Sequence, residues 1–154
     1  MTKAECQIDT MKHIEMVRML IWFFCKRLTE RGMEHDKLKM LPPELEAFAK
    51  APTLQDLSYD SPEYEESKKK LDAALEHHYA HYRHHPEHFT NGINDMDLID
   101  IVEMLCDWKA SSLRQHDGNL LKSIDVNAER FGYDEQVKQI FINTAKLFDT
   151  LLLD

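Results

Sequence analysis

Histidines are concentrated in one short stretch of this chain. Six of the nine histidines lie between residues 77 and 88. Neutral imidazole is the commonest metal ligand in proteins, so such a cluster predicts a metal site, with a solvated surface tract as the alternative. A helix drawn through this stretch places His78 and His85 on the face toward the core and His84 on the border of that face. The other potential ligands of the chain must decide between the two interpretations.

Further residues of metal-binding type lie on other predicted helices. His13 lies at the edge of an apolar stripe, and the pair His35-Asp36 follows that helix. Helical bundles build metal sites from side chains that project inward from facing helices. Imidazole and carboxylate together suit Mn²⁺, Fe²⁺, Co²⁺, Ni²⁺ or Zn²⁺ better than Ca²⁺. These residues therefore favour a divalent transition metal, as one or two ions.

One predicted helix carries a narrow acidic seam on otherwise apolar sides. The seam consists of Asp100, Glu103 and Asp107. A solvated helix face is normally broad and mixed in sign, so a narrow seam predicts a polar cavity inside the bundle. We favour Asp107 as the metal ligand of the three.

The composition predicts an all-α fold with about six to seven helices in a single domain, residues 1–154. The chain has only 4 Gly and 5 Pro, and it is rich in good helix formers. Gly32, Pro86 and Gly132 are expected to end helices. The expected long helices cover about residues 10–29, 61–85, 95–114, 120–131 and 134–153, with short helices near 34–39 and 43–51 and a loop over 52–61.

Charge and cysteine content limit the partners and the compartment. A net charge of −9 without an isolated basic run argues against long nucleic acids and anionic membranes. No apolar run is long enough to span a bilayer. Cys6, Cys25 and Cys106 form no CxxC pair, and we expect Cys25 and Cys106 to be buried. A reduced, cytoplasmic protein is the simplest interpretation, and a homo-oligomer is possible.

The order His13, His35-Asp36, Asp107 on an all-α chain resembles the HD-domain superfamily of metal-dependent phosphohydrolases. The surroundings also resemble a smaller family of phage and bacterial proteins that brings no known function. Its marks are His35-Asp36-x-x-Lys39 with Glu44, His84-His85-Pro86-Glu87-His88, Glu103-Met104-Leu105-x-Asp107-Trp108 and Asn127-x-x-Arg130. The gap between His13 and His35 is short for an HD protein, and His84-His85 is an additional element.

The HD resemblance implies metal-activated hydrolysis of a nucleotide or another small phosphate ester. It implies one metal held by His13, His35, Asp36 and Asp107, and His85 is a further candidate ligand. A second metal at His78, His84 or His85 is an additional hypothesis. Glu44 or Glu103 would act as general acid or base. The candidate substrate contacts are Arg18, Lys39, His78, His84 and Arg130. An HD-type di-iron oxygenase and a non-catalytic interaction protein stiffened by its metal are the alternatives.

Overall fold

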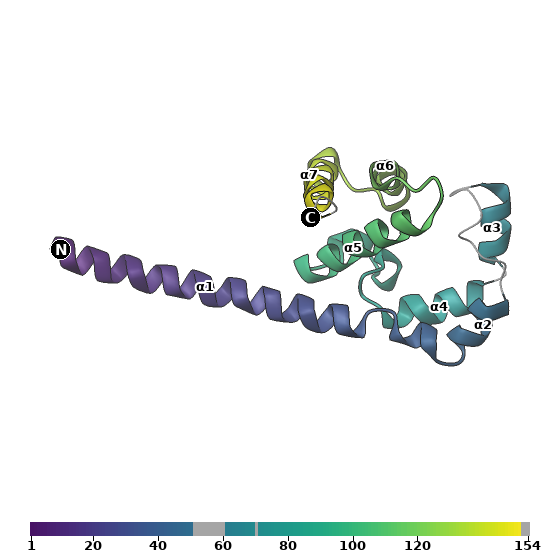
Figure 1. Ribbon diagram of the computed structural model, residues 1–154, viewed down its shortest axis with the longest axis horizontal. Helices are drawn as coiled ribbons and strands as arrows, with labels where there is room; N and C mark the ends of the chain where they lie inside the picture. The colour runs from purple at the N-terminus through teal and green to yellow at the C-terminus, as the bar shows by residue number, and fades with distance from the viewer. Residues whose placement is uncertain (51–60, 70, 152–154) are drawn as a thin grey trace. The chain divides into compact units, whose positions relative to one another are not determined.

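All regular elements among the described residues are helices, which confirms the predicted all-α fold. The computed structural model describes residues 1–50, 61–69 and 71–151. The chain divides into an N-terminal unit, Met1–His35, and a C-terminal unit, Asp36–Asp154. Each unit is described by itself, and the helices are labelled in Figure 1. The expectation of a single domain over residues 1–154 stays a prediction.

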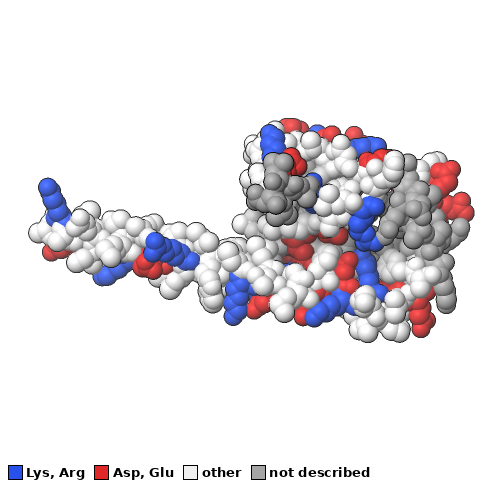
Figure 2. All heavy atoms as spheres, viewed as in Figure 1, with Lys and Arg blue, Asp and Glu red and all other residues white. Residues whose placement is uncertain are grey.

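The N-terminal unit is one long helix, α1 (Lys3–Glu34). Thr2 caps it: its hydroxyl accepts the amide of Glu5, and the Glu5 carboxylate accepts the amide of Thr2. The helix continues through Gly32, which was expected to end it, and reaches about 48 Å at 1.5 Å per residue. None of its residues is buried, and much of its surface is uncharged (Figure 2).

The first part of the C-terminal unit consists of short helices. A 3₁₀ turn (Lys37–Met40) leads into α2 (Glu44–Lys50), and α3 (Pro62–Lys69) and α4 (Asp72–His81) follow. Two more 3₁₀ turns, Pro86–His88 and Gly92–Asp95, connect α4 to the rest of the unit. α2 packs against α4.

Three longer helices, α5 (Leu98–Arg114), α6 (Leu120–Phe131) and α7 (Glu135–Leu151), form the apolar core. Met104, Ile124 and Phe141 are almost completely buried there, one from each helix. The indole of Trp108 stacks on Phe131. Asp97 caps α5 and Asn119 caps α6. Gly132, with φ of 67°, ends α6 as the sequence predicted.

The structure corrects the helix predicted over residues 61–85. α3 and α4 are separate, and α4 ends at His81 with Tyr82 in an extended conformation. Pro86 disfavours helical geometry at the residue before it, and His85 is indeed extended. The loop predicted over residues 52–61 lies outside the described residues, apart from Ser61.

The described helices include none with the length and hydropathy required to span a membrane. Figure 2 shows acidic and basic side chains interspersed on one face of the C-terminal unit. Cys106 is exposed on α5, and Cys25 is exposed on α1, so the prediction that both are buried was wrong. Cys106 lies on the side of α5 that also exposes Leu98 and Val102.

Candidate metal centre

Asp36 begins the C-terminal unit in an unusual backbone conformation. Its φ is 55°, in the left-handed region that Asp tolerates better than most residues. The amide of Leu38 donates to the hydroxyl of Tyr82 at 2.7 Å, which ties this segment to the end of α4. Lys39 Nζ binds Asp36 Oδ2 at 2.7 Å. Asp36 Oδ1 is directed toward a group of histidines.

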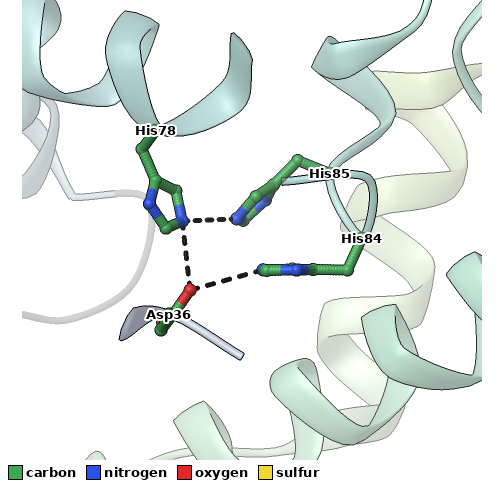
Figure 3. Close-up of side chains that lie close together, drawn as sticks. All are labelled: Asp36, His78, His84 and His85. Carbon is green, nitrogen blue, oxygen red and sulfur yellow. Dashed lines mark hydrogen bonds and ion pairs between the residues drawn. The ribbon is translucent and has the colours of Figure 1, made fainter. Parts of the chain in front are cut away.

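Three imidazoles gather around Asp36 Oδ1 (Figure 3). His78 Nε2 lies 3.2 Å from it and His84 Nε2 lies 3.6 Å from it. His85 Nε2 lies 3.0 Å from His78 Nε2. One ligand atom from each of Asp36, His78, His84 and His85 falls within 4.8 Å of all the others. We call these four residues the His/Asp cluster, and its spacing suits a metal ion.

The early end of α4 allows two consecutive histidines to join the cluster. On a helix, neighbouring side chains point about 100° apart, so His84 and His85 could not face the same ion. After His81 the chain leaves the helix, and the two imidazole centroids lie 4.1 Å apart. His78 and His84 are each 1% exposed. The prediction that His84 lies on the border of a helix face was therefore wrong.

Two carboxylates lie behind the rings of the cluster. Glu44 on α2 is fully buried, and its Oε2 lies 2.9 Å from His78 Nδ1. Glu103 on α5 is also buried, and its Oε1 lies 3.0 Å from His84 Nδ1. Each carboxylate therefore lies on the Nδ1 side of its own histidine ring, opposite Nε2. Glu103 of the acidic seam is thus buried beside a histidine, and the polar cavity predicted there stays a prediction.

Burial and neighbouring charge keep His85 neutral. Desolvation is the largest of the effects that lower the pKa of His85 to about 2, and the adjacent His84 and His78 act in the same direction. Asp36 has an opposing effect. A neutral imidazole is the form that binds metal ions, so His85 needs no deprotonation near pH 7.

An ion pair holds the segment that carries His84 and His85. Arg83 donates from Nε to Asp100 Oδ1 at 3.1 Å and from Nη2 to Asp100 Oδ2 at 2.7 Å. Asp100 is fully buried and also accepts the amide of Asp97. Arg83 lies over the ring of Phe89 as well. Asp100 therefore anchors the histidine segment and is not a member of the cluster.

The structure places the other predicted metal ligands differently. Asp107 has a carboxylate oxygen within 4.8 Å of one on Asp36, at the edge of the cluster. His35 caps the C-terminus of α1 and directly precedes Asp36 in the chain. Its role as a ligand stays a prediction.

His13 requires a correction. It lies on α1, and the continuous helix between it and His35 separates the two residues by roughly 33 Å at 1.5 Å per residue. His13 and His35 of one chain therefore cannot bind the same ion. The HD resemblance implied that both residues bind one metal ion, but α1 runs without interruption from Lys3 to Glu34.

Two predicted substrate contacts have partners elsewhere. Arg18 pairs with Glu15 one turn away on α1, and both side chains are exposed. Arg130 Nη2 lies 2.5 Å from Glu87 Oε1, and its guanidinium lies over Phe131. Lys39, in contrast, is bonded to a member of the cluster.

The sequence interpretation missed His77 and Arg83. His77 Nδ1 lies 2.8 Å from Glu44 Oε1, so one carboxylate holds two consecutive histidines. His77 could have been recognised from its place in the histidine run. Nothing in the sequence indicated that Arg83 pairs with Asp100, because the pair joins separate elements.

No match was found among curated proteins, and no solved structure matches the chain. A family model does match it, and the match covers residues 2–151, including every residue of the His/Asp cluster. The chain belongs to the family described as "Family of unknown function (DUF5662)".

Proposed function

We propose that this chain is a metal-dependent phosphohydrolase whose divalent transition metal is bound by Asp36, His78, His84 and His85. The observation that carries the proposal is the convergence of one ligand atom from each residue within 4.8 Å. Three imidazoles with one carboxylate form a donor set that suits Mn²⁺, Fe²⁺, Co²⁺, Ni²⁺ or Zn²⁺.

The charges around the cluster support a bound cation. In their ionised forms, Asp36, Glu44 and Glu103 bring three negative charges, and Lys39 brings one positive charge. Buried carboxylates are costly unless opposite charge lies close to them. A divalent cation at the centre of the cluster would neutralise the net charge of these three carboxylates and Lys39.

When bound, such a metal lowers the pKa of a coordinated water and polarises a phosphoryl oxygen. Asp36, His78, His84 and His85 would hold this metal, and it would supply both functions if it also accepted water and substrate. Lys39 stands beside the cluster with 38% of its side chain exposed. Its ammonium group is suited to binding a phosphate oxygen, an interaction that strengthens as charge develops in the transition state.

A nucleotide or another small phosphate ester is the proposed substrate class. The net charge of −9 and the interspersed surface charges do not favour long nucleic acids. The HD resemblance supplies the reaction type. It rests on His35-Asp36 and Asp107, and it stays a prediction.

Elemental analysis of the purified protein, followed by a phosphatase screen, tests the proposal. We expect about one transition metal per chain and hydrolysis of nucleoside mono- or triphosphates with Mn²⁺ or Co²⁺. Asp36→Asn and His78→Gln should lose both metal and turnover. Asp117→Asn, an exposed acid outside the cluster, is the matched control and should keep both. Full turnover in metal-free Asp36→Asn protein would refute the proposal.

A second candidate is a metal site that only stabilises the fold. The number of donors favours it, because four protein ligands close the coordination shell of a tetrahedral Zn²⁺. In that case the protein would hold one Zn²⁺ per chain, melt at a lower temperature after chelation and hydrolyse none of the phosphate esters. The same two measurements therefore separate the candidates.

A further inference from the structure

We infer that Glu44 and Glu103 are positioning residues, which fix His78 and His84 as the Nδ1-protonated tautomers so that both Nε2 lone pairs face the metal position. The inference rests on the proposed metal site and assigns the two carboxylates a role in its affinity. It differs from the role of general acid or base that the sequence suggested for them.

The surroundings of Glu44 fix the tautomer of His78. Each oxygen of the Glu44 carboxylate has its own imidazole: Oε1 lies 2.8 Å from His77 Nδ1, and Oε2 lies 2.9 Å from His78 Nδ1. An ionised carboxylate only accepts hydrogen bonds, so both Nδ1 atoms must donate. A neutral His78 then carries its lone pair on Nε2, which faces Asp36 Oδ1 and His85.

Glu103 pairs with His84 from a different helix, and this contact is an ion pair without the hydrogen-bond geometry of the Glu44 contacts. Its Oε1 lies 3.0 Å from His84 Nδ1, and both side chains are buried. Protonation at Nδ1 again leaves the Nε2 lone pair directed toward Asp36 Oδ1. Thus α2 and α5 each orient one imidazole of the cluster.

The position of Glu44 does not suit a general base. A base must approach the reacting proton to within hydrogen-bonding distance. The ring of His78 lies between Glu44 and the metal position, and the Glu44 side chain is fully buried. Carboxylates placed behind ligating histidines typically contribute 10- to 100-fold to metal affinity.

The tautomers can be measured directly in the wild-type protein. Long-range ¹H–¹⁵N spectra of the metal-free protein, assigned with His78→Gln and His84→Gln, distinguish protonation at Nδ1 from protonation at Nε2. We expect Nδ1–H for both histidines. Neutral Nε2–H tautomers at His78 and His84 would overturn the inference. This measurement needs no variant of Glu44 or Glu103 and no catalytic activity.

Glutamine variants then test the effect on affinity. Glu44→Gln and Glu103→Gln should each weaken Co²⁺ or Zn²⁺ binding by about 10- to 100-fold in a competition titration. Glu46→Gln on the same helix as Glu44 is the matched control, because Glu46 is exposed and should not alter affinity. Wild-type affinity in both cluster variants would contradict the inference.

Turnover at saturating metal separates a positioning residue from a base. If Glu44 only positions His78, excess metal should restore the turnover of Glu44→Gln. If Glu44 were a general base, turnover would stay low even with excess metal. A persistent loss with full metal occupancy would refute the positioning role. A protein that binds metal with the expected tautomers but hydrolyses nothing would end the proposed phosphohydrolase function and leave this inference intact.

Discussion

The stability of the metal-free protein should depend on pH through His85. Burial lowers the pKa of His85 to about 2 in the folded chain, against 6.5 as its ordinary value. Below pH 6.5 the unfolded chain therefore binds a proton that the folded chain does not. Stability should be level above about pH 6.5 and should fall as the pH decreases from there toward 2.

The expected size follows from these two pKa values. Between pH 7.5 and 5.5, proton binding by the unfolded His85 lowers the free energy of unfolding by about 1.4 kcal/mol. Both pH values lie far above the folded-state pKa, so the result does not depend on its exact position. Carboxyl groups titrate mainly at lower pH and contribute little in this interval.

Urea unfolding in the presence of a chelator measures this effect. The wild-type protein and His85→Gln should be compared at pH 7.5 and 5.5, since the other histidines remain in both proteins. We expect the wild type to lose about 1.4 kcal/mol more than the variant over this interval. His116→Gln removes an exposed histidine and should behave like the wild type. The same pH dependence in wild type and His85→Gln would refute the reasoning.

Three further predictions concern the cluster and its supports. Chelation should lower the melting temperature of the protein as isolated, and adding back Zn²⁺ or Mn²⁺ should restore it; an unchanged melting curve would argue against a bound metal. Arg83→Ala should destabilise the protein by about 1–3 kcal/mol in urea unfolding, because it leaves the buried Asp100 carboxylate without its bidentate partner. Arg114→Ala, at an exposed position, is the control. Equal stability of the two variants would contradict the role of the Arg83–Asp100 pair. Phe141→Ala should cost about 3–5 kcal/mol, because the side chain is 1% exposed among α5, α6 and α7, and a loss below 1 kcal/mol would be inconsistent with that packing.

The sequence determined the helical class and the boundaries of helices with strong local signals. α6 was predicted to its last residue, because Gly132 provides the left-handed conformation that ends a helix. The helix at residues 61–85 was predicted as continuous, since each residue there is compatible with a helix by itself. Its end at His81 depends on non-local contacts, among them the Arg83–Asp100 pair and the Tyr82 hydroxyl that accepts the Leu38 amide. Such contacts join residues that a local pattern cannot relate.

For the candidate site, residue types were predictable and their roles were not. The histidine run, Asp36 and the acidic seam all indicated metal chemistry, and the structure brings members of each together. Helical phase assigned His84 to a border, as a candidate substrate contact or ligand of a second metal, but the turn after α4 buries it beside His85.

The metal-binding groups were predictable from the sequence alone, as imidazoles and carboxylates in a helical chain. Which of these groups converge depends on the folded chain, because a metal site requires short distances between segments far apart in sequence. The fold places Asp36, His78, His84 and His85 around one point, and it places Glu44 beside Nδ1 of His78. It also separated His13 from His35 along an unbroken helix, which follows from the fixed rise per residue.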